Sequence, residues 1–328
     1  SGFSYYQLVK SGDLANETYK DSSYSGTITA SGTAITSKFF DFAPNLELSN
    51  NASLNATNLT LNTNSKLNLS ENSSAQIDNL IIKELSNLDG KITLDNSTFE
   101  VKESFTFDNS TFDLSKLSST AGLTLPTEYN LYAFNGSAIT TTNEFKNTKE
   151  NAEFVLDNKS TFNATNGVSF QSAKIGVQNE AEFTADSLTL GEKSTIDLTN
   201  SAKFTLKNGL QTQDLNLNLS NSSTLKAKSL TSKGASTINL DDKATLTLEN
   251  ALSSKDLTLA LKNESKFTAQ TLTASGVVNL QGDKNATLTL DTLTLNNAQA
   301  NINAKANIKN LTLNNTEEMA IGENVSIT

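Results

Sequence analysis

The nine-residue phrase LTNSAKFTL, from Leu198 to Leu206, recurs along the chain with small changes. VQNEAEFTA begins at Val177, 21 residues earlier, and LSNSSTLKA begins at Leu219, 21 residues later. Further copies are LDNKSTFNA from Leu156, LDDKATLTL from Leu240 and LKNESKFTA from Leu261. A fixed period of this length indicates a stack of similar structural units, each of which buries its apolar side against the next.

Apolar and small residues form columns that keep this period. One apolar column is Phe162, Phe183, Phe204, Leu225, Leu246, Phe267 and Leu288. A second apolar column is Phe154, Ile175, Ile196, Leu217, Ile238, Leu259 and Leu280. Two positions before the first column the residues are all small: Ser160, Ala181, Ala202, Ser223, Ala244, Ser265 and Ala286. Columns of this kind are expected where like residues from successive repeats stack on one another.

Within each repeat the apolar residues come in i, i+2 pairs, such as Ile196 with Leu198 and Phe204 with Leu206. This spacing is that of a β-strand, and the residues between the pairs are Asn, Ser, Asp, Lys and Gly, which favour turns. The sequence therefore predicts an all-β fold. We expect a parallel β-helix (solenoid) with rungs of about 21 residues, each made of three short strands.

An asparagine column lies in the turns: Asn158, Asn179, Asn200, Asn221, Asp242 and Asn263. Stacked Asn side chains can hydrogen-bond from rung to rung as an internal ladder. Asn also tolerates the left-handed backbone conformation, so the column could equally be a surface turn residue that repeats because the turn repeats. The sequence leaves both interpretations open.

The periodicity predicts three regions. Residues 1–44 contain a dense set of aromatic residues and are expected to form an N-terminal cap, or alternatively an aromatic binding surface. Residues 45–328 are expected to form the parallel β-helix, with an irregular excursion around 115–153 that is our preferred place for binding specificity. The repeat pattern still runs at Thr328, so we expect the natural protein to continue beyond it.

Composition limits the chemistry. The 328 residues include no His, no Cys and no Trp, and all 25 basic residues are Lys. The usual general base, thiol nucleophile, thiolate metal ligand and bidentate phosphate clamp are therefore missing. A net charge of −10 argues against nucleic acid as a partner, and no apolar run is long enough for a transmembrane helix.

Two pairs of adjacent acids are the best candidates for a catalytic or Ca²⁺ site, and both are more simply read as solvated turn residues. They are Asp241 with Asp242, and Glu317 with Glu318. Lys193 and Lys243 likewise read as surface charge. We therefore predict no catalytic, cofactor-binding or metal-binding residues, and a chain that is not an enzyme.

The Cys-free, Asn/Ser/Thr-rich repeats, with LTNSAKFTL and LKNESKFTA among them, resemble the passenger domains of Gram-negative autotransporters, including the vacuolating-toxin-like group of Helicobacter and Campylobacter type. The resemblance covers most of the chain. It implies a right-handed β-helix that is secreted or exported through the outer membrane to the cell surface. The family has no shared catalytic motif, so the resemblance implies no site residues.

On this basis we expect a virulence-related adhesin that binds host-cell surface glycans or receptors, or that associates with like rods. A toxin-like or host-modulating passenger is the alternative, and a carbohydrate-active β-helix enzyme is the third possibility.

Overall fold

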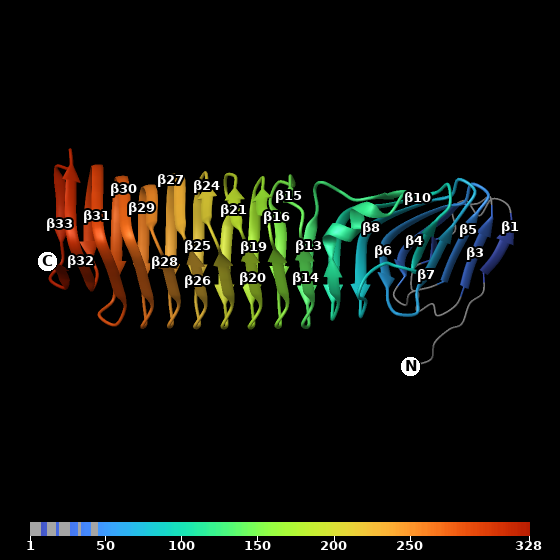
Figure 1. Ribbon diagram of the computed structural model, residues 1–328, viewed down its shortest axis with the longest axis horizontal. Helices are drawn as coiled ribbons and strands as arrows, with labels where there is room; N and C mark the ends of the chain where they lie inside the picture. Colours follow the sequence, from blue (N-terminus) through green and yellow to red (C-terminus); the bar gives the residue numbers. More distant parts are fainter. Residues whose placement is uncertain (1–7, 12–17, 20–26, 32–33, 41–44) are drawn as a thin grey trace. The chain divides into compact units, whose positions relative to one another are not determined.

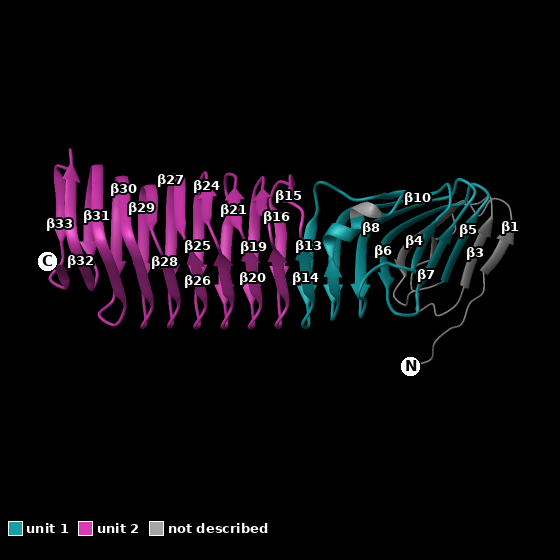
Figure 2. Ribbon diagram, viewed as in Figure 1, with its two compact units in different colours: residues 1–141 teal, residues 142–328 magenta. Residues whose placement is uncertain are grey.

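The structure is a computed structural model that describes residues 8–11, 18–19, 27–31, 34–40 and 45–328 (Figure 1). The chain is all-β, with 66% of residues in strands and 1% in helix. It forms a parallel β-solenoid of about 13 turns with rungs about 21 residues apart, which confirms the predicted fold class. The chain divides into two compact units, Ser1–Thr141 and Thr142–Thr328 (Figure 2).

The described part of unit 1 contains fourteen strands and one short 3-10 helix. In chain order they are β1 (Leu8–Ser11), β2 (Thr18–Tyr19), β3 (Thr27–Ser31), β4 (Ala34–Phe40), β5 (Asn45–Ser49), β6 (Ser53–Leu61), β7 (Lys66–Leu69), β8 (Ser74–Lys83), β9 (Ile92–Leu94), β10 (Thr98–Asp108), β11 (Thr111–Asp113), η1 (Leu114–Ser119), β12 (Leu123–Thr124), β13 (Asn130–Phe134) and β14 (Ala138–Thr141).

Parallel pairing in unit 1 begins before residue 45, where we expected the β-helix to start. β1 pairs with β3, and β3 pairs with β5, all in parallel. Farther on, Leu46 lies opposite Leu67 and Leu59 opposite Leu80, so the 21-residue period holds here too. The prediction of an aromatic cap concerns side chains that the structure does not describe, although Tyr19, Phe39 and Phe40 lie in described strands.

The expected excursion at 115–153 is irregular only in its first part. η1 follows β11, and the Asp113 side chain caps it by accepting a hydrogen bond from the Ser115 N–H at 3.0 Å. β13 then pairs in parallel with β10 and β14 with β11. The chain has therefore resumed the solenoid by Asn130. In β13 the inward residues are Leu131 and Ala133, whereas Tyr132 and Phe134 both face outward. The broken 21-residue phrase did not predict this regular strand.

Unit 2 contains twenty strands. They are β15 (Phe145–Asn147), β16 (Ala152–Leu156), β17 (Thr161–Ala164), β18 (Gly167–Phe170), β19 (Ala173–Gln178), β20 (Glu182–Ala185), β21 (Ser187–Leu190), β22 (Thr195–Thr199), β23 (Lys203–Leu206), β24 (Gly209–Thr212), β25 (Leu215–Leu219), β26 (Thr224–Ala227), β27 (Ser229–Leu240), β28 (Thr245–Leu248), β29 (Ala251–Leu261), β30 (Lys266–Gly282), β31 (Thr287–Asn303), β32 (Ala306–Asn314), β33 (Glu318–Ile321) and β34 (Val325–Ile327).

Three strands make each rung of unit 2, so the unit has three sheet faces. Face 1 is the ladder that starts β16–β19–β22–β25, and face 2 is the ladder that starts β17–β20–β23–β26. Face 3 is the ladder that starts β18–β21–β24–β27. All three ladders are parallel, and they share one core.

The core is built from the predicted columns. Phe162, Phe183 and Phe204 are at most 1% exposed and stack along the unit, with ring centroids 5.2 Å and 4.3 Å apart. Leu225 and Leu246 continue the column. Parallel rings at these distances add a small attraction to the burial of their apolar area.

The phrase LTNSAKFTL occupies one corner and its two flanking strands. Leu198, Ala202, Phe204 and Leu206 are buried, whereas Thr205 is exposed. Phe204 lies between Phe183 and Leu225 in register. The apolar residues of the phrase therefore face the core, as their i, i+2 spacing predicted.

Later rungs depart from the prediction of short strands. β30 and β31 each run for 17 residues across all three faces. In an earlier rung the corner between faces 2 and 3 interrupts the strand: β23 ends at Leu206 and β24 begins at Gly209. In β30 the corner between faces 2 and 3, around Gln270, is instead crossed in extended conformation.

Candidate interaction faces

The asparagine column lies at the corner between faces 1 and 2, which we call the asparagine corner (Asn158, Asn179, Asn200, Asn221, Asp242 and Asn263). Each of these residues is exposed and has a positive φ. The residue after each of them is also left-handed; Asn200 has φ 54° and Ser201 φ 61°. Asn adopts this conformation at less cost than most residues. The Ser201 N–H donates to the Asn221 carbonyl at 2.9 Å, so backbone pairing between rungs continues around the corner.

The same side chains form a ladder on the outside of the corner. Asn221 Nδ2 donates to Asn200 Oδ1 at 3.2 Å, and Asn200 Nδ2 donates to Asn179 Oδ1 at 2.9 Å. Asn179 Nδ2 donates in turn to Asp157 Oδ1 at 2.8 Å. Both interpretations of the column are therefore partly right: the residues are surface turn residues, and they also form a ladder, but the ladder is external.

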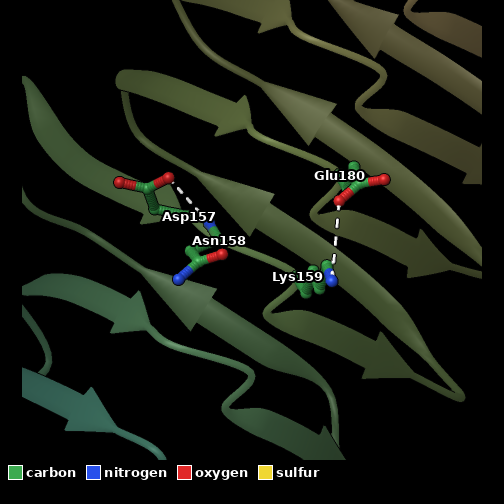
Figure 3. A network of polar contacts seen from close by, with 4 residues as sticks. All are labelled: Asp157, Asn158, Lys159 and Glu180. Atoms are coloured by element: carbon green, nitrogen blue, oxygen red, sulfur yellow. Dashed lines mark hydrogen bonds and ion pairs between the residues drawn. The ribbon is translucent and has the colours of Figure 1, made fainter.

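Asp157 stands at the beginning of the ladder, where it accepts from Asn179. Figure 3 shows Asp157 beside Asn158. Its carboxylate accepts the Asn158 backbone N–H at 2.7 Å in addition to the Asn179 amide. Beside it, Lys159 Nζ lies 3.9 Å from Glu180 on the next rung, and both side chains are more than half exposed. Exposed ion pairs of this kind contribute little stability, on the order of 0–1 kcal/mol.

A second external ladder crosses face 1. Asn239 Nδ2 donates to Asn218 Oδ1 at 2.9 Å, and Asn218 Nδ2 donates to Asp197 Oδ1 at 2.8 Å. An aspartate again begins the ladder, because a carboxylate can only accept. Sequence reasoning missed this ladder, although Asp197, Asn218 and Asn239 are spaced 21 residues apart.

The acidic pairs singled out in the sequence lie at the surface. Asp241 accepts the Asn263 side-chain amide and the Asp242 N–H, each at 2.8 Å, so it shapes the corner. Glu317 and Glu318 are both exposed, with Glu318 at the start of β33. Across the described residues, no three Asp or Glu side chains gather closely enough to hold a metal ion.

The two lysines singled out in the sequence also lie at corners. The Lys193 N–H donates to Asp214 Oδ1 at 2.7 Å, and Lys243 Nζ lies 4.0 Å from Glu264. A shallow groove runs along the asparagine corner from Asn158 to Lys243.

Asp283 is a carboxylate that sequence reasoning did not single out. It accepts backbone hydrogen bonds from Asn263 (2.8 Å), Asn285 (2.9 Å) and Ala286 (3.0 Å). These hydrogen bonds, with a smaller effect of the Lys262 charge, lower the pKa of Asp283. Its role is to hold the corner between two rungs.

Three aromatic residues of the segment around 115–153 fall into two groups. Tyr129 packs edge-on against Phe105, with ring centroids 5.5 Å apart, and burial raises its pKa. Tyr132 and Phe134 lie on the outward side of β13, half-buried, with ring planes 2° apart and centroids 6.4 Å apart.

Within the described part of the chain, no helix is long and apolar enough to cross a bilayer. No protein-family model, curated protein or solved structure matches the chain.

Proposed function

We propose that the chain is an adhesion module of the autotransporter-passenger kind, displayed on a bacterial surface or secreted, whose polar faces bind like chains or cell-surface glycans. One observation carries the proposal: hydroxyl and amide side chains stand outside a parallel solenoid in rows that stay in register from rung to rung. The ladder from Asp157 to Asn221 and the ladder from Asp197 to Asn239 are two such rows.

The chemistry of these rows suits recognition better than bond-making. Amide and hydroxyl groups donate and accept hydrogen bonds without needing a matched charge on the partner. A repeated row also offers many weak contacts at once, and multivalent contacts reach useful avidity although each is weak. The parallel solenoid fold is typical of autotransporter passengers, which supports the export route that we propose.

Beads coated with the chain test the proposal. We expect the beads to clump with one another, or to bind glycans or cultured cells, and we expect beads coated with the heat-denatured chain to do neither. If coated beads stay dispersed and retain neither glycans nor cells, the proposed function is wrong.

A further inference from the structure

Face 3 of unit 2 differs from the other two faces in its outward side chains. Eight strands contribute two outward columns, in register from β18 to β32. The first column is Gly167, Ser187, Gly209, Ser229, Ala251, Thr271, Thr292 and Asn310. The second is Ser169, Thr189, Gln211, Thr231, Ser253, Thr273, Thr294 and Thr312.

None of these outward positions carries a charge. In contrast, face 2 presents Glu182, Lys203, Lys226 and Lys266 on the outside, and face 1 presents Lys174 and Asp197. The nearest charged residues flank the two columns: Asp186 and Lys228 precede the first column by one position, and Lys233 and Lys255 follow the second by two, with Lys255 paired to Ser275 at the edge of the face. Depletion of charged residues at the centre and a polar rim are features of protein–protein interfaces.

The polar groups of face 3 are largely available to a partner. Of the sixteen outward residues in these two columns, all within the described part of the chain, Asn310 alone makes a side-chain hydrogen bond, a long one from Nδ2 to the Asp291 carbonyl at 3.4 Å. The hydroxyls of Thr189, Thr231, Thr273 and Thr294 are exposed or half-exposed and lie in one row.

We infer that face 3 is the surface on which two copies of this chain associate, which gives the proposed adhesion module its homotypic contact. Each copy carries a net charge of −10, so two copies repel each other over most approaches. A face without charge lowers this cost. Hydroxyl and amide groups both donate and accept, so a row of them can pair with a copy of itself, as a two-fold interface requires.

The size of the face sets the expected strength. Four-residue strands spaced at the usual distances cover about 13 Å by about 34 Å, or roughly 450 Å² per copy. A contact that buries roughly 900 Å² in total belongs to the weak, transient class. Association is therefore weak for a single pair and becomes strong where many copies face one another on two surfaces.

Disulfide trapping tests the face directly, because the chain has no cysteine of its own. Thr231→Cys and Thr273→Cys place single thiols on face 3. Thr205→Cys and Thr247→Cys are matched controls on face 2, equal to Thr231 and Thr273 in residue type and exposure class. Under mild oxidation of the full chain, we expect the face 3 variants to form covalent dimers on the order of tenfold faster, because an interface raises the local thiol concentration.

Charge insertion provides a second readout. Thr231→Lys combined with Thr273→Lys should weaken self-association of the chain at least about tenfold, because like charges then meet across the contact. The matched pair Thr205→Lys and Thr247→Lys should leave it nearly unchanged, with circular dichroism confirming that every variant is folded.

The possible outcomes separate this inference from the proposed function. If the chain self-associates but the face 2 thiols cross-link as fast as the face 3 thiols, the assignment to face 3 is wrong and the adhesion proposal stands. If the chain binds glycans or cells and never self-associates, the homotypic contact is wrong. If it neither binds nor self-associates, both proposals fail.

Discussion

At the scale of single residues, each corner asparagine adopts the left-handed turn and also joins the side-chain ladder. The sequence suggested each role as an alternative but not both together. The left-handed turn follows from residue type, because Asn is among the few residues that adopt it readily. Whether the side chain then points inward or outward depends on how the corner closes, which no local pattern reveals. The structure places the Asn200 side chain outside, between Asn179 and Asn221.

Substitutions at Asn200 can separate these two tasks. Asn200→Gly removes both ladder hydrogen bonds but keeps the left-handed backbone, so we expect a loss of about 0.5–1.5 kcal/mol in the free energy of unfolding. Asn200→Ala also forces an unfavourable φ and should cost about 1–2 kcal/mol more. Urea denaturation measures both. Equal losses for the two variants would show that backbone conformation is not limiting at this corner.

Asp283 should make stability depend on pH. Its pKa is lowered in the folded chain, so the folded state binds this proton less readily than the unfolded state does. The stabilisation is therefore fully present above the unfolded pKa of about 4 and is lost as the pH falls through the folded pKa.

We expect Asp283→Asn to destabilise the chain at pH 7 and to have a much smaller effect at pH 3. Denaturation curves of the two proteins at both pH values measure this difference. A destabilisation that is the same at pH 7 and pH 3 would contradict the assignment.

At the scale of elements, the i, i+2 pairs predicted the strands and their inward side chains well, because the periodicity of a strand is set by its own backbone. Strand ends were harder to predict. β30 continues through corners at Gln270 and Ser275, although the sequence predicted three short strands in each rung. Its path is set by pairing with β29 and β31, which a local reading of the residues does not contain.

The phenylalanine column should tolerate leucine but not alanine. Phe204 is fully buried and stacks on Phe183 at 4.3 Å. Phe204→Ala leaves a cavity and should cost about 3–5 kcal/mol. Phe204→Leu should cost less, about 1.5 kcal/mol, because Leu225 occupies the same column one rung later. Denaturant unfolding distinguishes the two, and equal losses would mean that ring stacking itself, rather than filled volume, stabilises this position.

At the scale of the whole molecule, the repeat predicted the solenoid, but it could not reveal which face is special. Each outward residue of face 3, such as Thr231 or Ser253, is ordinary in its own strand. The absence of charge becomes visible only after the rungs are aligned in space, because the relevant neighbours are about 21 residues apart. The external ladder on face 1 was not predicted for the same reason, because its residues become neighbours only when the rungs are aligned.

The net charge of −10 predicts the effect of salt on self-association. Salt screens the repulsion between two acidic copies and has little to screen at a contact without charges. Association should therefore strengthen when NaCl is raised from low concentration to about 0.5 M. Light scattering at both concentrations measures this. Weaker association in high salt would point to oppositely charged contacts, such as those of face 2, and away from face 3.

The amide ladders described above all run in one sense: the asparagine on the later rung donates, and the residue on the earlier rung accepts. This holds for Asn200 on Asn179, for Asn218 on Asp197 and for Asn72 on Asn51. Each asparagine inside a ladder, such as Asn200, therefore donates towards the preceding rung and accepts from the following rung. A rung can be duplicated or removed whole, and the join still matches donor to acceptor. A rung inserted in the reverse direction would place a side-chain oxygen against another side-chain oxygen, and neither can donate. The number of rungs can thus change by whole rungs, whereas the donor-to-acceptor direction of the ladders stays fixed.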